Sequence, residues 1–161
     1  MIRALKHLFV PDWIARRAFP AVDLKEIEKA IQASERSHDG ELRFVVEAGL
    51  PFSSLRLPTR KRAEALFAQL GAWDTEHNSG VLIYVQLLDR RIEIVADRGI
   101  AAKVAQGEWD AICRRMQERF SSHEFLQGSL EGIEGITAIL ARHFPPQGRN
   151  PNELPDKPVV I

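Results

Sequence analysis

Two hydrophobic patterns alternate along the chain, one with the period of a helix and one with the period of a strand. Residues 41–48 alternate apolar and polar side chains, and residues 80–88 form an almost continuous apolar run. Residues 91–96 place charged side chains between isoleucines. Alternation with a period of two is typical of half-buried strands, whereas a continuous apolar run is typical of a strand covered on both faces. These segments predict three strands, with 80–88 central and 91–96 at an edge.

Four longer segments space their apolar residues by three and four, as helices that bury one face do. They are residues 23–37, 59–70, 108–120 and 124–143. A short helical turn is also predicted at 100–104. Asp23, followed three residues later by Glu26, is a candidate capping box for the first helix. Three glycines interrupt the last helix and predict that another element packs closely there (Gly128, Gly132 and Gly135).

The order of these elements predicts a small mixed sheet between two layers of helices. The first two strands are joined by a helix, so they should be parallel with a right-handed crossover. The second and third strands are joined by a tight turn at Asp89-Arg90, so they should form a hairpin. The predicted strand order is 1-2-3, in an α/β three-layer sandwich with helices on both faces of the sheet.

The chain divides into a central domain, residues 21–145, and two appendages. Residues 1–20 form a basic amphipathic segment that either packs on the domain as a short helix or contacts a membrane surface or a partner. Residues 146–161 are rich in proline, which predicts a loosely held C-terminal tail.

Composition restricts the classes of partner and compartment. Lys and Arg together number 22, as do Asp and Glu, so the formal net charge is zero and a general nucleic-acid binder is not expected. The apolar runs are too short for a transmembrane helix, and the N-terminus lacks the uninterrupted apolar core of a signal peptide. We therefore expect a cytoplasmic protein, with peripheral contact to the inner membrane through residues 1–20 as the alternative.

The segment from Asn78 to Ile100 is similar to the central signature of TPM domains. It has an N-x-G turn, an apolar strand, an acidic-basic turn, a charged strand and an end that contains glycine. Trp73 before it, and the stretch from Phe125 through Gly128 to Gly132 after it, follow the order of the family. The resemblance covers about residues 24–144.

Membership of the TPM family would imply a Rossmann-like α/β sandwich. Plant members of the family occupy the thylakoid lumen, with acid phosphatase activity and roles in photosystem repair. Some animal members are accessory subunits of receptors, many bacterial members are envelope proteins, and calcium binding is associated with some. This chain departs from the pattern after the third strand. It has Asp97-Arg98-Gly99-Ile100-Ala101, where many members have a glutamate that follows Gly-aromatic-Gly-Leu.

The predicted topology brings polar residues together at the amino-terminal end of the two parallel strands. The third strand should end there at Asp97-Arg98, beside the loop that precedes the second strand (Asp74, Glu76, His77 and Asn78). The first strand should begin at the same end, where His38, Asp39 and Glu41 lie. Carboxylate oxygens in such a group could hold Ca²⁺ or Mg²⁺, which could activate water against a phosphate ester.

Under this hypothesis Asp74, Glu76 and Asp97 are metal ligands, His77 is an acid/base and Arg98 holds phosphate. The competing interpretation is a set of solvated loop residues and caps, and it is favoured because no defined metal-binding motif occurs. At the opposite end, Glu47, Gly49, Asp89 and Arg90 occupy the strand ends where α/β sheets commonly bind ligands, although a simple turn explains Asp89-Arg90.

Two functions follow from these observations. The first is a non-catalytic interaction or assembly module that binds an unknown protein partner. Cation binding by this module is left open. It is favoured because the sequence has no nucleophile elbow, P-loop or Cys-x-x-Cys, and because Cys113 lies on an apolar helix face. The alternative is a metal-dependent acid phosphatase that acts on phosphate esters.

Overall fold

The computed structural model describes residues 7, 10–11, 13–148 and 151–161. Its elements are the helices α2 to α7, one 3₁₀ turn and four strands (α2 Trp13–Ala18, α3 Ala21–Ser34, β1 Glu41–Glu47, η1 Phe52–Ser54, α4 Thr59–Gln69, β2 Gly80–Gln86, β3 Arg91–Ala96, α5 Arg98–Ala101, α6 Gln106–Ser121, α7 Phe125–His143 and β4 Val159–Val160). Leu5, Leu8 and Phe9 of the amphipathic segment lie outside the described residues.

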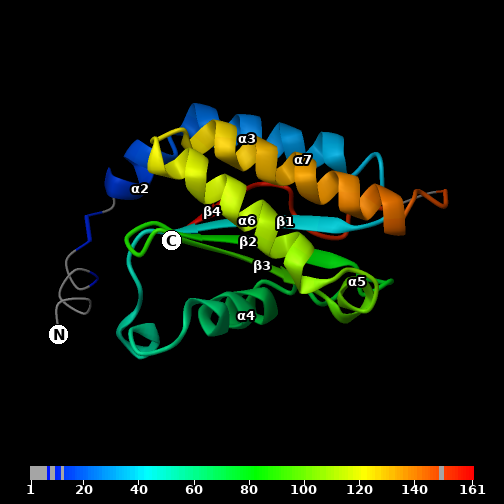
Figure 1. Ribbon diagram of the computed structural model, residues 1–161, viewed down its shortest axis with the longest axis horizontal. Helices are drawn as coiled ribbons and strands as arrows, with labels where there is room; N and C mark the ends of the chain where they lie inside the picture. Colours follow the sequence, from blue (N-terminus) through cyan, green and yellow to red (C-terminus); the bar gives the residue numbers. More distant parts are fainter. Residues whose placement is uncertain (1–6, 8–9, 12, 149–150) are drawn as a thin grey trace.

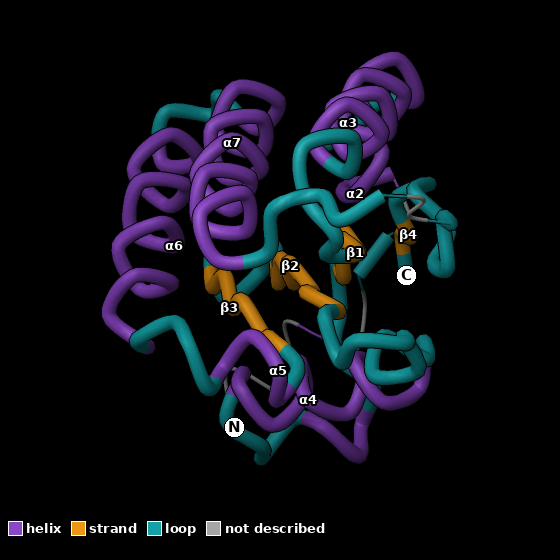
Figure 2. Tube along the Cα trace, turned by 90° about the vertical axis from the view of Figure 1, so that its right-hand side faces the viewer, coloured by secondary structure: helices purple, strands orange, loops and turns teal. Residues whose placement is uncertain are grey.

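The four strands lie in the order β3-β2-β1-β4 between two layers of helices (Figures 1 and 2). As predicted, β1 and β2 are parallel and β2 and β3 are antiparallel. Helices α3, α6 and α7 cover one face, and α4 covers the other. The three-layer α/β architecture predicted from the sequence is therefore confirmed.

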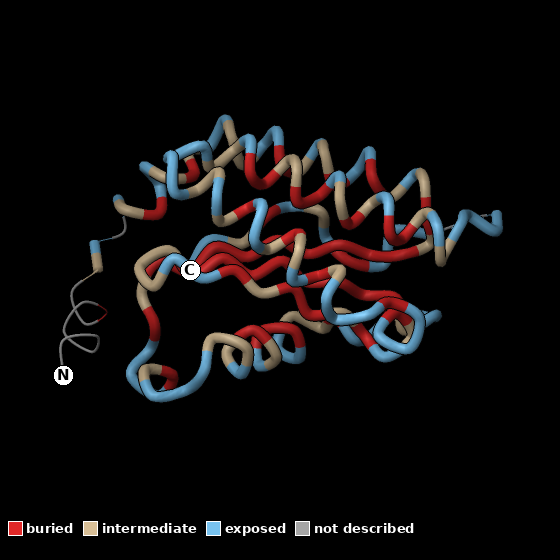
Figure 3. Tube along the Cα trace, in the orientation of Figure 1, coloured by how far each residue is buried: buried red, intermediate tan, exposed pale blue. Residues whose placement is uncertain are grey.

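Both faces of the central strands are buried (Figure 3). On the α3/α6/α7 side the core is built from one alternating set of strand residues, such as Phe44 and Ile83. The opposite set, which includes Val45 and Tyr84, packs against α4. Arg43 and Glu47, which the alternation of β1 suggested would face water, are instead buried on the α4 side, because a second layer covers that face.

The expectation of a loosely held tail is wrong for residues 151–161. Val159 and Val160 pair with Val45 and Val46 as a fourth strand, parallel to β1. Leu154 is buried, and the guanidinium of Arg43 donates to the carbonyl of Pro155. Strand pairing and these contacts therefore hold the tail along the edge of the sheet. The boundaries at residues 20 and 145 stay predictions.

Two local expectations also need correction. Helix α3 begins at Ala21, two residues before Asp23, and its N-cap is Pro20 without a side-chain cap. Proline holds φ near the helical value, so the helix can begin directly after it. The β2–β3 hairpin has a four-residue turn, Leu87 to Arg90, because Gln86 pairs with Arg91.

The glycines of α7 allow α6 to pack closely, as predicted. A Cβ atom on Gly132 would lie 2.4 Å from the sulfur of Met116, and one on Gly128 would meet Arg119 and Phe120. No helix in the described part of the chain is both long enough and apolar enough to cross a bilayer.

Candidate functional site

The amino-terminal end of the sheet brings together part of the predicted polar cluster. The side-chain oxygen of Asn78 accepts a hydrogen bond from Nε of Arg98 at 3.0 Å. Asp97 Oδ1 accepts the backbone N–H of Arg98 at 2.7 Å and so caps α5. The hairpin register carries Asp97 to the beginning of β2, as predicted, because Ala96 pairs with Val81.

The loop residues Asp74, Glu76 and His77 are exposed, and the C-terminal tail contacts this loop. The backbone N–H of Glu76 donates to the carboxylate of Glu153 at 3.0 Å. Among the described residues, no group of three or more His, Cys, Asp or Glu side chains is arranged to hold a metal ion. The metal role of Asp74, Glu76 and Asp97, and the catalytic roles of His77 and Arg98, stay predictions.

Three buried carboxylate oxygens at this end have no hydrogen-bond partner among the described residues, Asp39 Oδ1, Glu41 Oε1 and Asp97 Oδ2. Asp39 and Asp97 lie on opposite sides of the entry to β2. The hydroxyl of Ser79 donates to the carbonyl of Asp39, and the N–H of Asp97 donates to the carbonyl of Gly80. Unpaired buried carboxylate oxygens are costly, so this end of the sheet has acceptor capacity that its own chain does not use.

His38 and Glu41, also expected at this end, have structural partners. Nδ1 of His38 accepts the N–H of Gly40, so a neutral ring carries its proton on Nε2, 2.8 Å from the hydroxyl of Ser34. Burial lowers the pKa of His38 and raises that of Glu41. Glu41 accepts the N–H of Leu154 and so holds the tail. Burial, with Glu41 and Asp156 nearby, raises the pKa of Glu35 to about 9, so its carboxyl is protonated at neutral pH.

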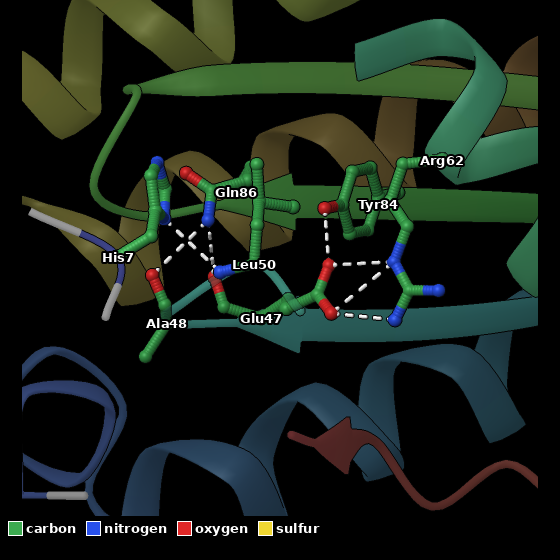
Figure 4. Close-up of polar contacts among 7 residues, drawn as sticks. All are labelled: His7, Glu47, Ala48, Leu50, Arg62, Tyr84 and Gln86. Carbon is green, nitrogen blue, oxygen red and sulfur yellow. Dashed lines mark hydrogen bonds and ion pairs between the residues drawn. The ribbon is translucent and has the colours of Figure 1, made fainter. Parts of the chain in front are cut away.

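The carboxyl end of the sheet contains a buried network centred on Glu47 (Figure 4). Nη2 of Arg62, from α4, donates to Glu47 Oε1 at 2.6 Å, and its Nε donates to Oε2 at 3.1 Å. The hydroxyl of Tyr84 donates to Oε2 at 2.5 Å. The ion pair with Glu47 raises the pKa of Arg62, whereas burial and the nearby carboxylate raise the pKa of Tyr84. Arg62 therefore stays charged and Tyr84 neutral, and the network fixes α4 to the sheet.

A second set of contacts holds the loops at the same end. Nε2 of Gln86 donates to the carbonyl of Ala48 at 3.0 Å, and its Oε1 accepts the N–H of Asp89 at 2.7 Å. The ring of His7 accepts the N–H of Leu50 at Nδ1 (Figure 4). Its Nε2 lies 3.2 Å from Asp89 Oδ1. The buried His7 thus joins the loop after β1 to the β2–β3 turn.

In the described part of the chain, three hollows adjoin α2. One of about 860 Å³ lies between α2 and the start of α7, and the other two lie on opposite sides of α2 at this end of the sheet. The larger of these two is a groove of about 980 Å³ with walls from α2, α3, the loop after β1 and β4 (apolar lining Val10, Phe19, Leu24, Leu50, Pro51 and Val160). The other is a smaller pocket of about 380 Å³ between α2, the β2–β3 turn, α6 and the start of α7. Open α/β sheets commonly bind ligands outside the carboxyl ends of their strands.

The sequence predicted this end only in outline. Glu47 and Asp89 were recognised at the strand ends, but their partners His7, Arg62 and Gln86 were not. The signal in the sequence was Glu47 itself, a charged residue at the end of a strand in a sheet predicted to have helices on both faces. A carboxylate buried there requires a cation, and this requirement pointed to a basic partner. The guanidinium of Arg62 is paired with Glu47 of the same chain.

The fold is an α/β sandwich whose small mixed sheet is stabilised by polar networks at both ends. The TPM domain profile matches residues 16–139, so the chain belongs to the TPM domain family. No curated protein matches the chain significantly.

Two solved structures show the same fold. The NMR structure of the BA42 protein from the psychrophilic bacterium Bizionia argentinensis has 31% sequence identity and a TM-score of 0.79. The match covers 89% of this chain and 95% of that one. The solution structure of the N-terminal domain of a P. gingivalis protein has 19% identity and a TM-score of 0.63, with 86% and 95% of the two chains covered. This second likeness shows the fold alone.

Proposed function

We propose that this TPM domain is an interaction module that binds a protein partner at the carboxyl end of its sheet. The observation that carries the proposal is the apolar groove at this end, together with exposed apolar side chains on the elements that adjoin it. Phe52 is 82% exposed, Val22 67% and Trp13 58%. They lie on η1, α3 and α2, and none of them lines the groove itself. Exposed apolar side chains near a groove are typical of a docking surface.

Two cationic side chains of α2 indicate the chemistry of the partner. Arg16 lines the groove, and Arg17, the next residue, lines the hollow between α2 and the start of α7. Both are exposed, and neither forms an ion pair with any described residue. Arg62 also lines the groove, but its charge is already neutralised by Glu47. The partner we infer is therefore a protein segment that inserts apolar side chains and carries carboxylates opposite Arg16 and Arg17.

Photo-crosslinking in the native host tests this proposal. The photoreactive residue p-benzoylphenylalanine would replace Phe52, Trp13 or, as a control, Trp73, which is 54% exposed on the loop before β2. We expect the same protein adduct from positions 52 and 13, none from position 73, and loss of the adduct when Arg17→Glu is added. An adduct that Arg17→Glu leaves unchanged, or that forms equally from position 73, would contradict the proposal.

A membrane surface is the competing partner, because basic amphipathic segments also bind anionic lipid. Vesicles of phosphatidylcholine, with and without phosphatidylglycerol, separate the two possibilities. We expect the full chain to stay in the supernatant with both kinds of vesicle. Co-sedimentation that requires phosphatidylglycerol and is lost in Arg16→Glu/Arg17→Glu would replace the protein partner by a lipid surface.

Cation binding at the amino-terminal end is a second candidate function, favoured by the unpaired oxygens of Asp39 and Asp97. Oxygen ligands of this kind suit Ca²⁺ or Mg²⁺. If they bind, Ca²⁺ should shift the amide resonances of residues 39, 79–80 and 97, and Asp97→Asn, which keeps the acceptor that caps α5, should abolish the shifts. Asp74→Asn and Glu76→Gln should leave them intact, because both carboxylates are exposed. Unmoved resonances at 39 and 97 would exclude the site. No contact among the described residues favours phosphatase activity specifically.

A further inference from the structure

The smaller pocket has the size and walls of a small-molecule site. Its volume of about 380 Å³ falls in the range of ligand pockets in proteins. Its apolar walls come from five elements (α2, β2, β3, α6 and α7) and the turn between β2 and β3, and include Ile14, Val85, Ile92, Phe120 and Phe125. The rings of Phe120 and Phe125 pack with their centroids 5.2 Å apart, and Phe19 packs against both. The walls are therefore part of the rigid core and would keep their shape around a ligand.

The rim of this pocket has an excess of positive charge. Arg90, Arg91 and His123 line it and are exposed. Among the residues that the structure describes, neither guanidinium has a carboxylate within ion-pair distance. The acidic residue of the lining, Asp89, is held by the ring of His7 at 3.2 Å and by the side chain of Gln86, which accepts its N–H. The two arginines are thus free to bind an anion that enters the pocket.

The backbone holds two of these basic residues in an unfavourable conformation. Arg90 has φ 52° and His123 has φ 63°, and Asn78 is the only other described non-glycine residue with positive φ. Arg90 closes the hairpin turn, with its N–H on the carbonyl of Leu87, and His123 ends α6, with its N–H on the carbonyl of Phe120. Glycine is the favoured residue at such positions. The chain instead has two basic side chains there, and both line the same pocket.

We propose that this pocket binds a small organic anion with an apolar body, separately from the docking groove. The apolar part would lie against Val85, Phe120 and Phe125, and the anionic group would lie at the rim between Arg90, Arg91 and His123. The two hollows share no lining residue, because Ile14 and Ala18 of α2 face the pocket whereas Ala15 and Arg16 line the groove. Loss of one site therefore does not imply loss of the other.

Anilinonaphthalene sulfonate, which has an aromatic body and one sulfonate, is a suitable fluorescent probe, and N-phenyl-1-naphthylamine is its uncharged counterpart. We expect the sulfonate to bind and the uncharged amine to bind at least about tenfold more weakly, as loss of a charge-assisted hydrogen bond requires. Octanoate or octyl phosphate should displace the probe, and their relative potency identifies the preferred anionic group. Displacement by octanol at the same concentration as octanoate would overturn the proposal.

Arg90 and His123, whose backbone has positive φ, can be replaced by glycine without a change in backbone conformation. Arg90→Gly and His123→Gly remove the basic side chain where glycine is favoured, so both should fold, and each should weaken probe binding at least about tenfold. Arg114→Gln, which removes an exposed charge from α6 outside the pocket, is the matched control and should bind normally. Normal binding by both glycine variants, or probe-induced shifts in the amides of the docking groove instead of residues 85–92 and 120–125, would refute the site.

Discussion

Replacing Gly80 by alanine is expected to prevent stable folding. Gly80 begins β2, and a Cβ atom there would lie 1.8 Å from the carbonyl oxygen of Ala72. Gly80 and Ala72 are both buried, so the clash cannot be relieved by a side chain. Moving the backbone at Gly80 would displace β2 from β1, because Gly80 pairs with Glu41. Overpacking of this severity belongs among the largest single-residue effects, about 4 kcal/mol or more in the free energy of unfolding.

Urea unfolding followed by circular dichroism measures this effect, and Gly107→Ala is its matched control. Gly107 lies in the first turn of α6, and a Cβ there meets no atom within 4 Å. Alanine should stabilise the helix at that position by up to about 1 kcal/mol. A Gly80→Ala protein as stable as the Gly107→Ala protein would show that β2 does not enter the sheet beside Ala72 as described.

Removal of the Arg62 guanidinium is expected to cost about 3–5 kcal/mol, the usual result when a buried ion pair loses one partner. In Arg62→Leu the carboxylate of Glu47, whose side chain is 3% exposed, would retain only the hydroxyl of Tyr84. Glu47→Gln combined with Arg62→Leu should recover much of the stability, because a neutral amide needs no cation.

The neighbouring Lys61→Ala is the control for Arg62→Leu. Lys61 forms an exposed ion pair with Glu64, three residues away, and such pairs contribute at most about 1 kcal/mol. Equal unfolding free energies for the Lys61 and Arg62 variants would contradict the view that Glu47, Arg62 and Tyr84 form one buried network.

The fold could be predicted from local patterns because each layer leaves a period in the sequence. The apolar run that became β2, the alternation of β3 and the stripes of α4, α6 and α7 were sufficient for the sheet topology and the two helical layers. The tail could not be predicted in the same way. Val159 and Val160 form too short a strand to show a period, and their pairing with β1 depends on contacts across more than 100 residues.

The candidate sites were harder to predict because side-chain partners do not follow from strand register alone. Register was sufficient to bring Asp97 to the beginning of β2. It could not show that α4 would direct Arg62 onto Glu47, or that His7 would connect two loops. It also could not show that Arg90 and His123 would meet at one pocket, because each is an unremarkable turn residue until α6 packs beside the hairpin.

The central claim is that the domain acts through the carboxyl end of its sheet, and crosslinking from Phe52 compared with Trp73 tests it most directly. The two aromatic side chains are both largely exposed, one beside the docking groove and one on the loop before β2. The account predicts a discrete protein adduct from position 52, shared with position 13 and dependent on Arg17, and none from position 73. A discrete adduct from position 73 alone would place the partner-binding surface at the amino-terminal end of the sheet and contradict the account.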